Sequence, residues 1–122
     1  MTLPIAKILN VTRGSVIAEQ AELARTFAAR GQGLLGRDSL ASGSGLVIDP
    51  EWSIHMLFMR FPIDVLFVNA AHRVVGMRAA LPPWSPFAGV APWRGRYVVE
   101  LPVGAIAASG TQIGDLIVIE ER

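Results

Sequence analysis

Three polar side chains interrupt the longest apolar stretch of the chain, Ser53 to Asn69 (SIHMLFMRFPIDVLFVN): His55, Arg60 and Asp64. Burying an imidazole, a guanidinium or a carboxylate among large apolar side chains costs free energy unless each one finds a partner. Pro62 has no N–H for a sheet ladder and predicts a bend in the middle of the stretch. This bend is therefore where we expect a small polar site in an otherwise apolar domain.

His55 lies four residues before Met59, and in an extended strand the two side chains would face the same side. Imidazole and thioether form a soft ligand pair that suits copper. No second histidine lies close in the sequence, however, and two ligands do not make a site, so we predict neither a metal nor another cofactor. Three interpretations of His55 remain open: a structural histidine, a contributor to a ligand pocket, and a metal ligand or general base.

Asp64 has a structural and a functional interpretation. Strand alternation places it on the side of Leu66 and Val68, away from Val65 and Phe67. A carboxylate in such surroundings needs hydrogen bonds or a cation, so it either caps backbone N–H groups of the bend or pairs with an arginine. The available partners are Arg30, Arg37 and Arg60. In the functional interpretation the carboxylate contributes to the pocket.

The tryptophans suggest what such a pocket would bind. Trp52 precedes the apolar stretch, and Trp84 and Trp93 lie in a proline-rich segment, so all three could rim one concave face. Flat aromatic rings beside arginines and carboxylates are what a sugar, a peptide or a small organic acid would meet. In the alternative interpretation the rings cover an open end of the sheet as core. The predicted ligand-binding residues are Arg37, Trp52, His55, Met59, Asp64 and Trp93.

Catalysis has less support in the sequence. The chain has no cysteine, which excludes disulfides, thiolate nucleophiles and cysteine zinc sites. No glycine-flanked serine of the nucleophile-elbow type is present. We favour a non-catalytic ligand-binding or accessory module. The alternative is a small hydrolase or metal-dependent enzyme that uses His55 with Asp64 or Glu100, and whether the protein is an enzyme stays open.

Composition limits the class of protein. A chain of 122 residues predicts a single domain over residues 1–122. At 52% hydrophobic and 17% charged residues it predicts a core buried on more than one face of a sheet. A net charge of +1, with charges spread along the chain, points to neither nucleic acid nor a polybasic lipid-binding segment.

Neither a membrane span nor a signal peptide is predicted. Arg60 and Asp64 interrupt the only candidate for a run of about 18 uncharged apolar residues. The first residues lack the basic and apolar regions of a secretion signal, so cytoplasmic location is the default expectation. The sequence makes no prediction of oligomeric state.

The elements that must position these residues are short. Strands are predicted at Ile5–Leu9, Ser15–Glu22, Gly45–Ile48, Ile54–Phe61, Ile63–Val68, Arg73–Ala79, Tyr97–Leu101 and Leu116–Glu120. Helices are predicted at Glu22–Arg30, ended by Gly31, and at Pro102–Ser109, ended by Gly110. Leu81–Arg96 reads as an irregular loop that packs onto the domain. The prediction is an α+β fold with about seven short strands and two short helices, in a mainly antiparallel sheet that curls or partly closes into a barrel.

Several blocks resemble, in order and spacing, the bacterial and archaeal family called domain of unknown function 192. These blocks are Arg30–Arg37 (RGQGLLGR), His55 with Met59, Phe61–Phe67 (FPIDVLF), Val99–Gly104 (VELPVG) and Gly114-Asp115. The resemblance covers roughly residues 8 to 120. It implies a small α+β barrel-like domain, often preceded by an export signal, with no established activity. Leu35 stands where the family usually has methionine and Phe61 where a smaller residue is common, changes that affect only pocket size.

Overall fold

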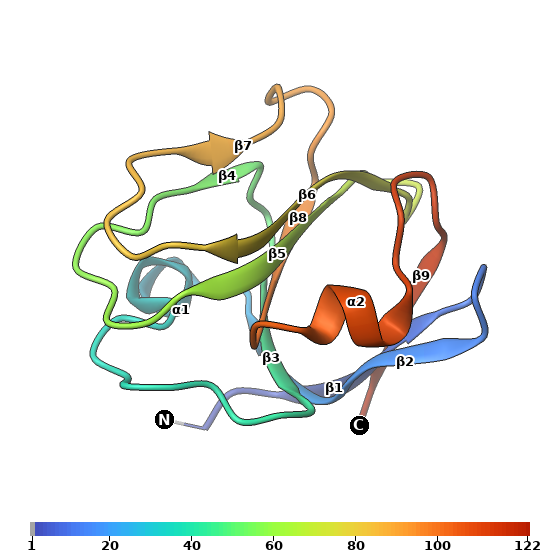
Figure 1. Cartoon of the computed structure of the whole chain (residues 1–122), viewed down its shortest axis with the longest axis horizontal. Coiled ribbons are helices and arrows are strands. Elements are labelled where there is room, and N and C mark those ends of the chain that lie inside the picture. Colours follow the sequence, from blue (N-terminus) through green and yellow to red (C-terminus); the bar gives the residue numbers. More distant parts are fainter. Residues whose placement is uncertain (1) are drawn as a thin grey trace.

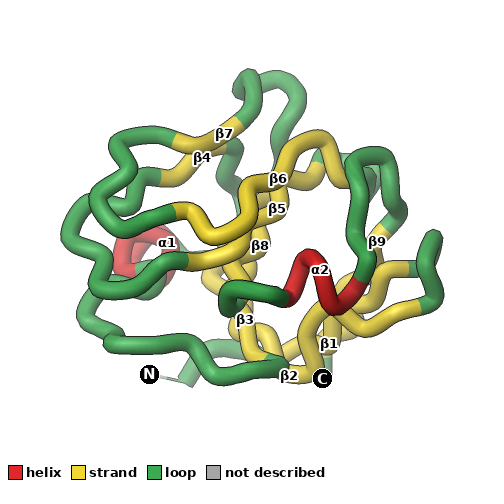
Figure 2. Tube along the Cα trace, in the orientation of Figure 1, coloured by secondary structure: helices red, strands yellow, loops and turns green. Residues whose placement is uncertain are grey.

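A computed structural model describes residues 2–122 as a seven-stranded sheet that curls on itself, with two short helices (Figure 1, Figure 2). The strands of this sheet are β1 (Ile5–Asn10), β2 (Ser15–Ala24), β3 (Ser44–Ile48), β5 (Ile63–Val68), β6 (Val74–Leu81), β8 (Tyr97–Leu101) and β9 (Ile117–Glu121). β4 (Ser53–Ile54) and β7 (Ala88–Gly89) form a separate pair. The helices are α1 (Phe27–Gln32) and α2 (Ala105–Ser109).

The main sheet has the order β6-β5-β8-β3-β2-β1-β9. Its neighbouring strands are antiparallel except β2 and β3, which are parallel, so the sheet is mixed with antiparallel pairing dominant. The two edges meet where Arg73 forms a bridge to Leu116 and the N–H of Gly114 donates to the carbonyl of Val74 at 2.8 Å. The predicted α+β fold with a curled, partly closed sheet is confirmed.

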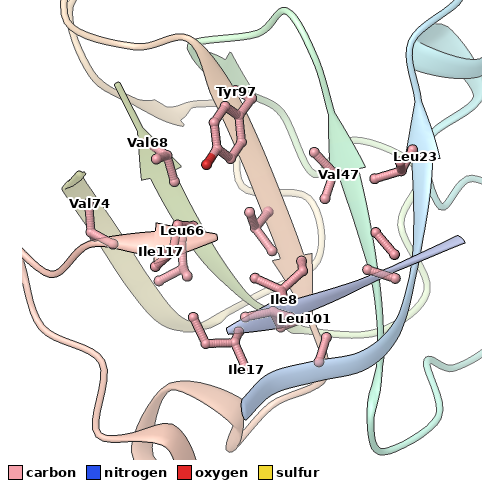
Figure 3. Close-up of a cluster of buried hydrophobic side chains, with 14 of the residues drawn as sticks. Ile8, Ile17, Leu23, Val47, Leu66, Val68, Val74, Tyr97, Leu101 and Ile117 are labelled. Atoms are coloured by element: carbon pink, nitrogen blue, oxygen red, sulfur yellow. The ribbon is translucent and has the colours of Figure 1, made fainter. Parts of the chain in front are cut away.

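Both faces of the sheet are buried. Every strand of the main sheet contributes to the inner core, the cluster of buried side chains inside the curl, which Figure 3 shows. The outer core is the second cluster, on the opposite face, where residues of β3, β5 and β8 meet Leu34, Met56 and Met59. In β5, Leu66 and Val68 belong to the inner core, whereas Val65 and Phe67 belong to the outer core. Period-two alternation therefore assigns every residue of a central strand to one of two buried environments.

The first helix differs from the prediction of Glu22–Arg30. β2 extends through Ala24, because Leu23 and Ala24 pair with β3 and are buried on the sheet. α1 begins only at Phe27, after Thr26, whose hydroxyl accepts a hydrogen bond from the N–H of Ala29 at 3.1 Å. Gly33, with a φ of 50°, ends the helix instead of Gly31. Sheet pairing outweighed the helix propensity of residues 22–24.

The predicted strand Ile54–Phe61 is also wrong. Only Ser53–Ile54 is extended as β4, and residues 55–62 form turns and bends, with Phe58 at a φ of 66°. The segment pairs with the proline-rich loop, where the N–H of Met56 donates to the carbonyl of Ser85 at 2.8 Å. The apolar run thus buries Met56 and Met59 in a turn, and strand alternation does not apply to His55 and Met59.

The remaining elements lie close to their predicted positions. The β1–β2 and β5–β6 hairpins are present, and β8 has the predicted bounds. The segment Leu81–Arg96 is irregular apart from the end of β6 and the two residues of β7. α2 starts three residues later than Pro102 but ends, as predicted, at Gly110, which has a φ of 68°.

Asp64 holds together the inner core beneath α2. Its side chain is only 1% exposed. One carboxylate oxygen accepts from the N–H of Ala80 at 2.9 Å, and the other accepts from Gly104 at 3.1 Å and Ile106 at 3.0 Å. The carboxylate thus joins β5 to the end of β6 and to the start of α2, which has no capping side chain of its own.

These donors are not the ones expected for Asp64. They are neither N–H groups of the bend at Pro62 nor an arginine. Arg37 instead forms an ion pair with Glu22 at 2.9 Å, and Arg60 forms one with Asp38 at 2.9 Å. The contacts of Asp64 therefore agree with its structural interpretation. Its partners are backbone N–H groups at the end of β6 and at the start of α2.

Asp115 has a comparable role where the sheet edges meet. Its carboxylate accepts hydrogen bonds from Arg13 and Asn10 at 3.0 Å and from the N–H of Gln112 at 2.9 Å. The hydrogen bond from Arg13 is the largest of the effects that lower the pKa of Asp115 to about 2. The Gly114-Asp115 block is thus part of the contact that closes the curl.

Replacing Asp64 by alanine should lower the free energy of unfolding by about 3–5 kcal/mol, because three N–H groups lose their acceptor. Urea denaturation of the Asp64→Ala protein tests this. Asp38→Ala is the matched control, since it removes a carboxylate from an exposed ion pair and should cost less than about 1 kcal/mol. Equal stability of the two variants would contradict the structural role of Asp64.

Candidate ligand-binding site

A cavity of about 110 Å³ lies on the outer face of the sheet, between α1 with its glycine-rich turn and the segment that follows β4. This space is several times the roughly 10–15 Å³ that one water molecule occupies by the same measure. Its lining residues are Arg30, Gly31, Gln32, Gly33, Leu34, Leu35, Ile48, Glu51, Ser53, Ile54, His55, Met59 and Glu100. Polar and apolar side chains therefore line the cavity in similar numbers, a lining that suits a small polar ligand.

Glu100 contributes a carboxyl group to this cavity from the middle of the sheet. It lies in β8, paired with Leu46 of β3 and Val65 of β5. Its neighbours Val99 and Leu101 point into the inner core, so alternation directs Glu100 to the outer face. The side chain is 6% exposed, and the effects that shift its pKa are burial and the charges of Arg37 and Glu51, with no hydrogen bond among them. The sheet thus places an ionisable group at the cavity, largely shielded from water.

The environment of Glu100 changes its protonation. Burial disfavours the charged form and raises the pKa of Glu100 from 4.5 to about 7; the charge of Arg37 counteracts part of this effect and that of Glu51 adds to it. Near neutral pH the carboxyl is therefore divided between its two forms. It can donate a hydrogen bond when protonated and accept several when ionised.

Arg30 brings a cation to the same cavity. One terminal nitrogen of its guanidinium donates to the carbonyl of Pro50 at 2.9 Å, and the group lies 6.0 Å from the ring centre of Phe27. Its Nε is buried and has no hydrogen-bond partner among residues 2–122. Glu51 lines the cavity as well, with one carboxylate oxygen accepting from the N–H of Trp52 at 3.0 Å.

Two of the predicted ligand-binding residues, His55 and Met59, line the cavity together. His55 is exposed, and its Nδ1 accepts a hydrogen bond from the N–H of Leu57 at 3.3 Å. Met59 is buried and forms part of the apolar wall. Arg37 does not line the cavity, but its positive charge acts on Glu100.

The other three predicted residues lie elsewhere. Asp64 faces the inner core, on the opposite side of the sheet from Glu100, because it pairs with Leu101. Trp52 lines a neighbouring hollow that shares Arg30 and Glu51 with the cavity. Trp93 is largely exposed. Of the two carboxylates that could act with His55 in the catalytic alternative, only Glu100 therefore shares a cavity with it.

Arg30, Glu51 and Glu100 line the cavity but are not among the ligand-binding residues predicted from the sequence, where Glu100 belongs only to the catalytic alternative. A glutamate inside the apolar strand YVVEL was the available signal for Glu100. Arg30 was considered only as a partner of Asp64, and in the structure it lies in the last turn of α1. Among residues 2–122, no group of three or more histidine, cysteine, aspartate or glutamate side chains is arranged to hold a metal ion.

Comparison with known proteins places the chain in context. The profile of the DUF192 family, described as "Uncharacterized ACR", matches residues 8–119. The UPF0127 protein of Thermococcus sibiricus is 34% identical over 122 residues, covering 94% of this chain and 77% of that protein. A UPF0127 protein of Pyrococcus furiosus is 36% identical over 111 residues, covering 88% of this chain and 93% of that protein.

A solved structure supports the fold. The crystal structure of a protein of unknown function from Novosphingobium aromaticivorans superimposes with a TM-score of 0.78 at 27% identity. The match covers 94% of this chain and 83% of the other. Within residues 2–122, no helix has the length and apolar character needed to cross a membrane.

The buried carboxyl of Glu100 predicts how stability depends on pH. Because its folded-state pKa, about 7, lies above the ordinary 4.5, the native protein keeps this proton to higher pH than the unfolded chain does. The free energy of unfolding should fall as pH rises through this window, by up to about 1.4 kcal/mol per pH unit. Glu100→Gln should remove that fall.

Denaturant titrations at several pH values between 4.5 and 8 measure the effect. The stability difference between Glu100→Gln and the unmodified protein should grow up to about pH 7 and then stay constant. Glu120→Gln removes an exposed carboxylate of β9 and is the matched control. Its stability difference from the unmodified protein should not change with pH. If the free energy of unfolding depends on pH in the same way in all three proteins, Glu100 is not a buried acid.

Proposed function

Because this chain belongs to the DUF192 family, an uncharacterised one, we propose its function from the site: it is a non-catalytic module that binds a small polar ligand in the cavity above Glu100. The ligand displaces water from the outer face of the sheet and supplies hydrogen bonds that the protein itself leaves unmade. Arg30, Glu51, His55 and Met59 complete the site.

The observation that carries this proposal is a largely buried glutamate, Glu100, that lines the cavity and whose pKa is raised by that burial. Buried polar groups in folded proteins are nearly always hydrogen-bonded, and exceptions call for an explanation such as a bound ligand or water. Among residues 2–122, the Nε of Arg30, which also lines the cavity, is a buried polar atom without a hydrogen-bond partner. A carboxyl and a cation at one cavity favour a ligand that hydrogen-bonds to both.

The charges of the site narrow the ligand class. Glu100 and Glu51 both bring carboxylates, so a ligand that presents hydroxyl or amino donors to them is favoured over a bare organic acid, whose negative charge they would repel. An acceptor atom on the same ligand would meet Arg30. Of the three classes suggested by the sequence, a sugar or the amino end of a peptide fits better than an organic acid. The cavity volume limits the buried part of the ligand to a small group.

One observation favours a second candidate function. Glu100 and His55 line the same cavity, and a carboxyl with a pKa near 7 suits general acid and base catalysis at neutral pH. A small hydrolase could use this pair. The metal-dependent version predicts tight binding of a transition metal that is lost in His55→Ala, which calorimetry measures directly.

Calorimetric titration of the protein with monosaccharides, dipeptides and short carboxylic acids tests the binding function. We expect at least one hydroxyl- or amine-bearing compound to bind, and Glu100→Gln to weaken that binding roughly tenfold to a hundredfold, in line with the loss of a hydrogen bond to a charged group. An amine should also release a proton from Glu100 on binding near pH 6, since the ligand favours the ionised carboxylate.

Glu120→Gln is the matched control and should bind like the unmodified protein. Binding by no compound of the series, or binding that Glu100→Gln leaves unchanged, would overturn the proposal. Turnover of a compound that stops in both Glu100→Gln and His55→Ala would establish the enzymatic alternative instead.

A further inference from the structure

Two loops at one end of the molecule are fastened to each other. We call them the aromatic loops: residues 52–62 and residues 82–96. β4 pairs with β7 at their centre, and the N–H of Trp84 donates to the carbonyl of Met56 at 2.7 Å. A further bond joins the N–H of Val90 to the carbonyl of Trp52 at 3.0 Å. In Figure 1 they surround β4 and β7, on the side of the molecule away from the marked chain ends.

The aromatic loops display large apolar side chains to solvent. Five of the six exposed aromatic residues of the described chain lie on them, with exposed fractions from 37% to 86%: Trp52, Phe58, Trp84, Phe87 and Trp93. The rings of Phe58 and Trp84 are 4.9 Å apart, and those of Trp52 and Phe87 are 6.5 Å apart. These rings do not cover the end of the sheet as core. Exposed apolar residues gathered in this way mark an interaction surface.

The loops are packed tightly enough to hold these rings in place. A Cβ added at Gly89 would come within 2.6 Å of Ser53, and one added at Gly95 within 2.8 Å of Trp52. Met56 and Ala88, on the same two loops, are buried. The exposed rings are therefore carried by two loops whose backbones pack closely against each other.

The charge of the aromatic loops is one-sided. Neither loop contains an aspartate or glutamate, whereas together they contain Arg60, Arg94 and Arg96. Arg60 and Arg96 form ion pairs with Asp38 and Asp49, which lie outside the loops. Arg94, beside the most exposed tryptophan, has no ion-pair partner among residues 2–122. The surface thus combines apolar rings with a positive charge and lacks negative residues of its own.

We propose that the aromatic loops dock this protein onto the surface of a lipid bilayer, with a preference for anionic lipid. Tryptophan and phenylalanine side chains partition into the interfacial region, and arginines beside them are attracted to anionic headgroups. The protein then lies on the membrane through loops and needs no spanning segment. This docking is independent of any ligand above Glu100.

The ring geometry argues for a bilayer over a polysaccharide. Stacking on a flat sugar chain requires rings in one plane, but the planes of Phe58 and Trp84 are tilted by 59° and those of Trp52 and Phe87 by 57°. Insertion into the apolar part of a bilayer does not require the rings to share one plane. The positive charge also has a counterpart in anionic headgroups.

Sedimentation with phosphatidylcholine vesicles, with and without phosphatidylglycerol, tests the docking. We expect binding to both, stronger with phosphatidylglycerol, and a blue shift of tryptophan emission on binding. Phe58→Ser combined with Trp84→Ser should reduce the bound fraction by at least about fivefold. Arg94→Gln should reduce the preference for phosphatidylglycerol.

Val103→Ser combined with Ile113→Ser is the matched control, because both residues are exposed and apolar but lie outside the aromatic loops. This control should bind vesicles like the unmodified protein. Absence of vesicle binding, or equal loss in both double variants, would overturn the proposal. So would self-association or polysaccharide binding that disappears in the Phe58 and Trp84 variant while vesicles are not bound.

Discussion

A sheet buried on both faces leaves the side chains of its central strands almost no access to bulk water, and the rest of this structure follows from that constraint. Apolar residues of β5 and β8 satisfy it by packing into one core or the other. Glu100 does not, because it carries a carboxyl group to the cavity on the outer face while only 6% of the residue is exposed. Burying this carboxyl costs free energy, and for that reason the cavity on the outer face is the candidate ligand-binding site.

Two carboxylates on neighbouring strands show how the faces differ. Asp64 points into the inner core and is satisfied by three backbone N–H groups, so it fixes α2 and the end of β6. Glu100 points the other way, toward α1 and the segment after β4, and meets open space. Asp64 pairs with Leu101, the residue that follows Glu100. The structural carboxylate and the candidate ligand-binding one are therefore one residue apart across two neighbouring strands. Chemistry at Glu100 can therefore vary without affecting the contact that holds the inner core together.

Elements that depend on local patterns were predicted correctly from the sequence. Elements whose structure is determined by pairing with distant segments were not. Hairpins, the whole of β8 and the glycine stop of α2 follow from alternation and turn residues, and the family resemblance indicated the curled α+β fold. The helix expected at Glu22–Arg30 begins late because residues 23 and 24 pair with β3, and the expected strand at Ile54–Phe61 turns because it pairs with the proline-rich loop. His55 and Met59 reach one cavity, although not for the reason of strand alternation. The importance of Glu100 could not be weighed from the sequence, because its burial and the cavity that it lines depend on three strands and a helix that are far apart in the chain.

The measurement that tests this account most directly is a nuclear magnetic resonance titration of the Glu100 carboxyl carbon in the folded, ligand-free protein. A buried carboxyl without protein donors should titrate at about 7. The midpoint should move when a ligand with hydroxyl or amino donors is added. A midpoint near the ordinary 4.5 would mean that the carboxyl is solvated or hydrogen-bonded within the protein, and it would contradict the central claim.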